Sequence, residues 1–273
     1  MSELSKAALN DREARSLDAV LYWSSSRAFL GALSGDGALI LMDEECKSLE
    51  DFRGKYFALP AFALPYRSFS ILADNGGVYD LVPSPFLTDE KSLGLWLPAL
   101  GESEAVHIDD LPSQDCGVVY PVEREFREFA SRSFSRQSYH HPVSGLCLAA
   151  LQLSRKNDED CLLAMVTGFP ESPRLDLAHA SRGKLLFAHR FPIYGESDVL
   201  YFVTAAWRSE GLDQDKSLLR LYGDRLSPEM TSKIEALRRS VHSFSLNDYE
   251  ELGAERAGAD GFPAPVRLRM LCA

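Results

Sequence analysis

The order of strand-like and helix-like segments between residues 161 and 269 constrains the fold of this 273-residue chain more than any other feature. Three strands are predicted first, at Cys161–Thr167, Leu175–His179 and Lys184–Phe187. A helix, a strand, a second helix and a last strand are predicted to follow, near Ser197–Glu210, at Leu218–Tyr222, near Pro228–His242 and near Pro265–Leu271. Alternation of this kind predicts an α/β fold.

Three strands followed by alternating helices and strands are typical of a ribonuclease-H-like half-domain. The earlier part of the chain opens in the same way, with short strands predicted at Leu17–Trp23, Ala28–Leu33 and Leu39–Met42. Two such halves facing each other across a cleft make an actin-like fold, and this architecture is our prediction. We expect a tail at residues 1–16, a first lobe at 17–154 and a second lobe at 155–273.

The middle of the chain carries weaker signals. Asp74-Asn75-Gly76-Gly77 predicts a hairpin turn between strands at Phe69–Ala73 and Val78–Val82, because Asn and Gly adopt positive φ readily. Thr88 predicts the start of a helix that Pro98 ends early. Further expected elements are a strand at Val118–Val122, helices at Glu123–Ser133 and Pro142–Ser154, an ambiguous segment at Glu44–Leu64 and a surface loop at Asn247–Gly261.

Composition limits the classes of partner. The net charge of −11 disfavours nucleic acid, since phosphate binding needs a surplus of Lys and Arg or a basic patch. The five cysteines form no C-x-x-C pair, which fits free thiols in a reducing cytoplasm. The polar Met1–Ser16 segment does not resemble a signal peptide, and no apolar run reaches the ~18–20 residues that cross a bilayer.

Several short motifs, in order, resemble a bacteroidete-type family of uncharacterised cytoplasmic proteins. They lie in Phe69–Phe86, with its strand ending Leu81-Val82-Pro83, in Val118–Gly145 and in Gly183–Asp224, which ends Leu221-Tyr222-Gly223-Asp224. The resemblance spans nearly the whole chain. It implies an actin-like ATPase fold without an established activity, and it provides no catalytic residue to transfer to this sequence.

Actin-like ATPases use two Asp-x-Gly phosphate hairpins and a Gly-Gly pair near the adenosine, and this chain departs from all three. The first position reads Ser24-Ser25-Ser26-Arg27, the second Thr167-Gly168-Phe169-Pro170, and the third Gly223-Asp224. The degenerate cleft positions are therefore Ser24, Ser25, Ser26, Gly168, Gly223 and Asp224. We predict no catalytic residue, no metal site and no cofactor, and we expect nucleotide binding to be absent or weak.

Other motifs have competing interpretations. Ser24–Arg27 is a polar turn or an anion site, and Gly223-Asp224 is a strand-end turn or a ligand contact. For His140-His141 we favour a structural role, in which one imidazole caps the helix starting near Pro142 or bonds a backbone carbonyl, and the other is exposed. The apolar loops Pro60–Tyr66 and Phe262–Pro265 either cover the core or present a surface to a partner.

These observations predict a non-catalytic cytoplasmic protein, a pseudo-ATPase that binds an unknown protein partner without inserting into a membrane. The first alternative is an ATP-dependent phosphotransferase with diverged loops, in which Asp224, Asp176 or Asp18 holds Mg²⁺ in an open cleft. The second is an actin-like scaffold or complex subunit. Bulky side chains in the cleft would count against the phosphotransferase.

Overall fold

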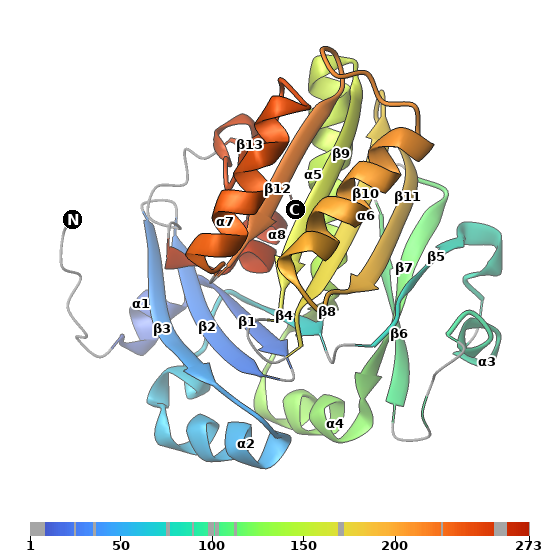
Figure 1. The fold of residues 1–273 in the computed structure, drawn as a ribbon. Helices are drawn as coiled ribbons and strands as arrows, with labels where there is room; N and C mark the ends of the chain where they lie inside the picture. Colours follow the sequence, from blue (N-terminus) through green and yellow to red (C-terminus); the bar gives the residue numbers. More distant parts are fainter. Residues whose placement is uncertain are drawn as a thin grey trace.

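The chain forms two lobes, each built on a five-stranded sheet (Figure 1). The structure is a computed structural model, and it describes residues 9–272 apart from residues 25, 35–36, 75–76, 89, 98–100, 102–103, 112–113, 169–171, 225 and 254–260. Each lobe opens with an antiparallel meander of three strands, as the sequence predicts. The boundary between the lobes at residues 154 and 155 stays a prediction.

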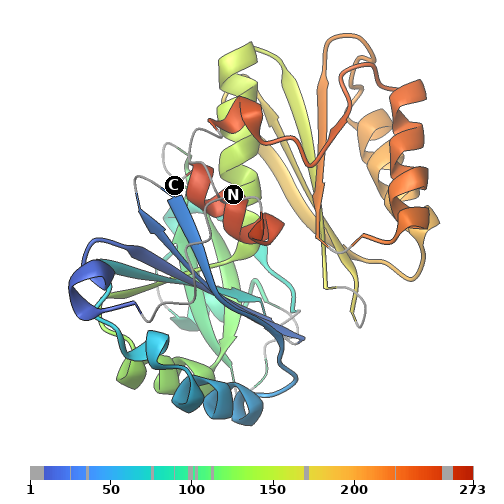
Figure 2. The same cartoon turned by 90° about the vertical axis from the view of Figure 1, so that its left-hand side faces the viewer.

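The first lobe has the strand order β3-β2-β1-β4-β8. Strands β4 and β8 run parallel to β1, whereas β2 and β3 complete the antiparallel meander. The bounds of the strands are β1 Asp18–Ser24, β2 Arg27–Ser34, β3 Gly37–Glu45, β4 Ser68–Asp74 and β8 Gln137–His140. The outer face of this sheet is covered by α2 Leu49–Ala58, the short helix Pro60–Ala63 and α4 Arg124–Ser133, and a short α1 at Asp11–Ala14 precedes β1 (Figure 2).

Aromatic side chains fill the layer between this sheet and its helices. Trp23 stacks on Phe126 at a ring-centroid distance of 5.0 Å, and Phe52 lies 4.9 Å from Trp23. Phe62 and Tyr66 are buried in the same cluster, so the Pro60–Tyr66 segment covers the core. A small third sheet, with the order β5-β7-β6, lies beside this lobe and consists of β5 Asp80–Pro83, β6 Glu104–Asp110 and β7 Cys116–Glu123. The short helices Ser84–Phe86 and α3 Glu90–Gly94 follow β5.

The second lobe has the strand order β11-β10-β9-β12-β13. Strand β12 runs parallel to β9, because the helix α6 carries the chain across the sheet between β11 and β12. The bounds are β9 Asp160–Thr167, β10 Arg174–Ser181, β11 Lys184–Pro192, α6 Glu196–Ser209, β12 Leu218–Gly223, α7 Pro228–Glu235 and β13 Ser245–Leu246. Helix α7 continues as a 3₁₀ turn at Ala236–Arg239, so the predicted helix near Pro228–His242 ends early.

Two helices fill the space between the sheets. Helix α5 (Pro142–Asn157) is buried along most of its length, and α8 (Ala264–Cys272) packs across it (Figure 2). A Cβ added to Gly145 would lie 2.8 Å from the backbone nitrogen of Arg269, so the glycine permits this close crossing. Between β13 and α8, a 3₁₀ turn at Glu250–Leu252 interrupts the predicted surface loop.

Helix α8 corrects the prediction of a strand near Pro265–Leu271. Ala264 and Leu268 pack into the core around α5, whereas Val266 and Met270 pack on the first-lobe sheet. These are two i, i+4 stripes on opposite faces of a helix that is buried from two sides. Interleaved in sequence, they mimic the alternation of a strand.

The predicted hairpin between Phe69–Ala73 and Val78–Val82 is also wrong. Strand β4 pairs with β1 on one edge and β8 on the other, so neither edge is left for β5. Strand β5 instead pairs with β7 in the third sheet. The turn residues Asn75 and Gly76 lie outside the described residues, and the strands β6 and β8 have no counterpart in the prediction.

Candidate functional site between the lobes

The carboxyl ends of parallel strands from both lobes meet in one region. In the first lobe, Ser24 at the end of β1 lies opposite Asp74 at the end of β4. In the second lobe, β9 ends at Thr167 and the neighbouring β12 ends at Gly223. Ligands of open α/β sheets bind outside the carboxyl ends of the strands, so this region is the candidate site.

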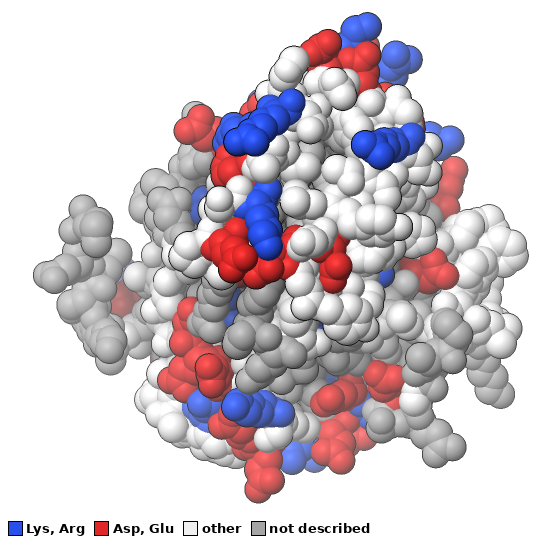
Figure 3. Space-filling model, viewed as in Figure 1, with Lys and Arg blue, Asp and Glu red and all other residues white. Residues whose placement is uncertain are grey.

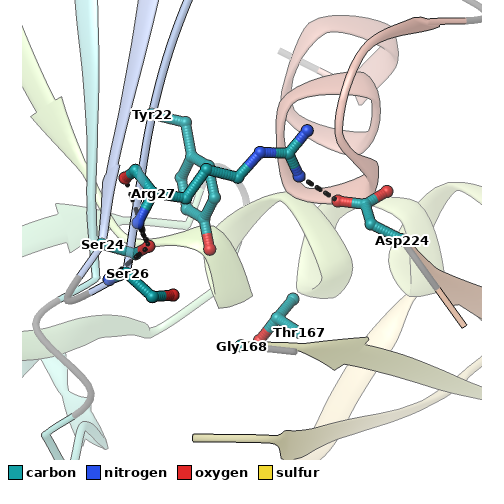
Figure 4. Close-up of a pocket in the computed structure, with 7 residues that line it drawn as sticks. All are labelled: Tyr22, Ser24, Ser26, Arg27, Thr167, Gly168 and Asp224. Carbon is teal, nitrogen blue, oxygen red and sulfur yellow. Dashed lines mark hydrogen bonds and ion pairs between the residues drawn. The ribbon is translucent and has the colours of Figure 1, made fainter. Parts of the chain in front are cut away.

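Four of the six predicted cleft residues line one cavity here (Figure 4). Ser24, Ser26, Gly168 and Asp224 face each other across it, and the remaining lining residues are Tyr22, Arg27 and Thr167. The cavity measures about 20 Å³, which is room for about one water molecule. As these described residues line it, this cavity has no space for a nucleotide in this conformation.

The other two predicted residues lie differently. Ser25 falls outside the described residues. Gly223 is held by Asn247, whose side-chain oxygen accepts from the Gly223 N–H at 2.8 Å and whose amide nitrogen donates to the Gly223 carbonyl at 3.1 Å. These two bonds occupy both backbone polar groups of Gly223, which favours its interpretation as a strand-end turn.

Asp224 joins three elements. One carboxylate oxygen accepts from the backbone N–H of Ala264 at 2.7 Å and thereby caps the start of α8. The other oxygen accepts from Arg27 Nη1 at 3.3 Å, which connects the two lobes. Arg27 also donates to both oxygens of Asp43 at 2.7 and 2.9 Å. The arginine of the anion site predicted at Ser24–Arg27 is thus already paired with two of the protein's own carboxylates, Asp43 and Asp224.

A buried arginine, Arg190, connects the two lobes near these strand ends. Arg190 on β11 is directly opposite Asp176 on β10 and donates to its two oxygens at 2.8 and 2.9 Å. The same guanidinium crosses to the first lobe, where it donates to Asp74 at 2.8 and 3.3 Å and to the Gly77 carbonyl at 3.1 Å. Arg174 adds a bond to Asp74 at 3.4 Å. Both carboxylates are fully buried.

The charges and the burial of this cluster determine the protonation states of Asp74 and His141. Burial raises the pKa of Asp74, but the guanidinium groups of Arg190 and Arg174 outweigh it and hold the pKa far below its ordinary range. The neighbouring His141 is also buried, and burial together with Arg190 lowers its pKa to about 3. The cluster therefore contains ionised Asp74, charged arginines and a neutral imidazole at neutral pH.

These residues do not fit a magnesium nucleotide. A divalent ion needs free carboxylate oxygens, whereas the oxygens of Asp74 and Asp176 receive the N–H groups of Arg190. Of the three carboxylates predicted from the sequence, Asp224 accepts from Arg27 and Ala264, and Asp176 accepts from Arg190. Asp18 lies at the start of β1, away from the cleft, and accepts from Arg67 and Ser68. Among the described residues, no group of three or more His, Cys, Asp or Glu has the arrangement of a metal site.

The two adjacent histidines have separate roles. His141 caps α5, since its Nδ1 accepts from the Val143 N–H at 3.1 Å, which confirms the predicted cap. His140 is not the exposed partner that the sequence predicts. Only 15% of its side chain is accessible, and its Nδ1 lies 2.9 Å from Asp109 on β6.

The three residues at the centre of the cluster are not predicted from the sequence. The Asp74-Asn75-Gly76-Gly77 motif predicts only a turn at Asp74, and no motif includes Arg174 or Arg190. A signal was available in the strands: Asp176 and Arg190 are charged residues that stand between apolar neighbours in two strands of an antiparallel meander. The bonds from Arg174 and Arg190 to Asp74 join positions about a hundred residues apart, which no local pattern encodes.

The two ribonuclease-H-like lobes and the site at their facing strand ends define a protein with the actin-like ATPase fold. A crystal structure from Bacteroides thetaiotaomicron, described as a protein with actin-like ATPase fold and unknown function, is similar with a TM-score of 0.75 at 16% identity, covering 89% of this chain and 96% of that one. The PilM–PilN type IV pilus biogenesis complex contains a chain that is similar with a TM-score of 0.55 at 12% identity, covering 94% and 98%.

The protein belongs to the family DUF3822, which is described as a protein of unknown function; its family model matches residues 54–241. The resemblance stated from the sequence is thereby confirmed. The search of curated proteins found no significant match.

Proposed function

We propose that this chain is a pseudo-ATPase: a cytoplasmic binding or regulatory protein that uses an actin-like fold without nucleotide chemistry at the cleft. The observation that carries the proposal is the position of Arg190. Its guanidinium supplies a fixed positive charge between Asp74 and Asp176, in the part of the cleft where an actin-like ATPase needs a free carboxylate for Mg²⁺. The water-sized cavity beside it supports the same conclusion.

Ion pairs between the lobes support a fixed closed state. Arg27 of the first lobe reaches Asp224 of the second, and Arg174 and Arg190 of the second reach Asp74 of the first. Gln114 adds two bonds across the same boundary, to the Gly183 carbonyl at 3.1 Å and from the Leu185 N–H at 3.0 Å. A partner that binds both lobes would meet a preorganised surface, which lowers the entropic cost of binding.

A protein partner fits the remaining observations better than nucleic acid or lipid. The chain in the PilM–PilN complex is described as part of an assembly, and this chain shares its fold. On the face in Figure 3, Lys and Arg are interspersed with Asp and Glu among the described residues, in keeping with the net charge of −11. None of the helices in the described part is both long and apolar enough to cross a bilayer. The five cysteines are free thiols, which suits a reducing compartment.

The test is a melting experiment with and without millimolar Mg-ATP, Mg-ADP and Mg-GTP, paired with an assay for released phosphate. A ligand present at about 100 times its Kd stabilises the folded state by about 2.7 kcal/mol. We expect no shift and no phosphate release. A nucleotide-dependent shift accompanied by turnover would instead support the diverged phosphotransferase, and concentration-dependent sedimentation would support the scaffold.

A further inference from the structure

A second cluster of polar side chains lies at the far edge of the first-lobe sheet. Strand β8 is the edge strand, and Ser138 and His140 are alternate residues of it, so they lie on the same face. That face is the one covered further along by α8. Ser138 is exposed, whereas Asp109, which approaches from β6, is 5% exposed.

The three side chains form a continuous chain of hydrogen bonds. Ser138 Oγ lies 3.0 Å from His140 Nε2, and His140 Nδ1 lies 2.9 Å from Asp109 Oδ1. The second oxygen of Asp109 accepts from the His141 backbone N–H at 3.3 Å, which fixes the carboxylate in place. Burial raises the pKa of Asp109, but the hydrogen bond from His140 helps to outweigh it, and that pKa lies below its ordinary value.

A neighbouring arginine identifies the tautomer of His140. Arg269 Nη2, on α8, lies 3.2 Å from His140 Nε2. A guanidinium only donates, so Nε2 must be the acceptor and Nδ1 must carry the proton toward Asp109. The Ser138 hydroxyl lies 3.0 Å from the same nitrogen, so Arg269 and Ser138 share its one lone pair. This is the arrangement that activates a serine nucleophile in hydrolases of unrelated folds.

We propose that Ser138, His140 and Asp109 form an acyl-transfer site that hydrolyses small carboxylic esters. When an ester binds, Arg269 turns from His140 Nε2 to the ester carbonyl oxygen, which frees the lone pair of Nε2. Ser138 Oγ then attacks the ester carbonyl while Nε2 takes its proton, and the tetrahedral intermediate expels an alkoxide that receives this proton from His140. Water then attacks the acyl-serine with His140 again as base, which releases the acid and restores the hydroxyl. Asp109 is a positioning residue that holds the imidazole.

Two further groups define the substrate class. Arg269 makes no ion pair with a carboxylate among the described residues, so its charge can face the oxygens of a bound ester or an anionic substituent. Ser70 Oγ, opposite Ser138 on β4, lies 3.4 Å from Ser138 Oγ and offers a second donor. The open edge suits a small substrate. This inference does not rest on the proposed function, since it concerns a different set of residues.

The experiment uses a fluorophosphonate probe on the full chain, with the modified residue located by mass spectrometry. Ser138 Oγ forms a bond to phosphorus, fluoride leaves, and His140 takes the proton. We expect a single adduct on Ser138, and we expect labelling and p-nitrophenyl acetate hydrolysis to fall roughly 100-fold or more in Ser138→Ala and His140→Gln. Ser131→Ala is the matched control, because Ser131 is an exposed serine whose hydroxyl donates to the Glu128 carbonyl, away from any histidine partner among the described residues.

The variants also separate catalysis from structure. Ser138 is exposed, so its removal leaves the fold intact, and circular dichroism spectra and melting curves of each variant confirm this. Asp109→Asn should lower the labelling rate while the protein remains folded. Absence of an adduct on Ser138, or labelling at the same rate with and without the His140 imidazole, overturns the proposal.

Discussion

Replacing Arg190 by methionine tests the central claim about the cleft. Methionine keeps much of the apolar stem and removes the guanidinium, which donates four bonds to Asp74 and Asp176 and one to the Gly77 carbonyl. Two fully buried carboxylates would then lose their main counter-charge, with Arg174 left to compensate Asp74 alone. Breaking a buried ion pair by removing one partner costs about 3–5 kcal/mol.

The assay is urea unfolding at neutral pH, monitored by circular dichroism. The free energy of unfolding is calculated from the midpoint concentration of urea, with one m-value used for all variants. Arg67→Met is the matched control, because Arg67 bonds to the Asp18 carboxylate at an exposed position and a surface pair is worth about 0–1 kcal/mol. We expect Arg190→Met to lose several times more stability than Arg67→Met. Equal losses from the two substitutions would refute the reasoning.

A cation rescue extends the same test. If the Arg190 guanidinium supplies the charge that a metal supplies elsewhere, millimolar Mg²⁺ or Ca²⁺ should raise the melting temperature of Arg190→Met and leave the unmutated chain unchanged. Adding Asp74→Asn and Asp176→Asn to Arg190→Met should recover much of the lost stability and abolish the effect of the ions.

Three further predictions follow from single residues. The pKa of His141 is about 3 in the folded chain and about 6.5 in the unfolded chain, so the unfolded state binds an extra proton at pH values between the two. The free energy of unfolding should therefore fall by about 1.4 kcal/mol per pH unit as the pH drops through this window. His141→Asn, which retains a capping acceptor, should remove this contribution to the slope in urea unfolding measured across the pH range. Gly31→Ala should destabilise by about 1–3 kcal/mol in urea unfolding, since the new Cβ would lie 2.7 Å from the Phe262 ring. Asp224→Ala should cost about 1–2 kcal/mol by removing the acceptor for the Ala264 N–H, measured as a lowered melting temperature; an unchanged value would show that this cap contributes nothing.

The fold was predictable where local pattern and burial agree. The second-lobe meander, the start of α7 after Ser227 and the cap of α5 by His141 all follow from short-range chemistry. The prediction failed at α8, where burial on two faces mimics a strand, and at β4, whose two edges are both occupied.

The site was predictable only in outline. Strand-end positions such as Ser24 and Gly168 lie where the fold places them, at one cavity. The pairing of Arg190 with Asp74 depends on how the two lobes approach each other, and the meeting of Asp109 with His140 depends on the third sheet. Both are consequences of tertiary structure that residue spacing does not express.

The position of α8 has a consequence for the order in which this protein folds. Its Val266 and Met270 cover apolar side chains of the first strands, including Tyr22 and Phe29. During synthesis those strands leave the ribosome long before the helix that covers them. The first lobe therefore exposes an apolar face to solvent while the second lobe is being synthesised. A ribosome-bound chain halted before residue 264 should therefore recruit chaperones, and the released full chain should not.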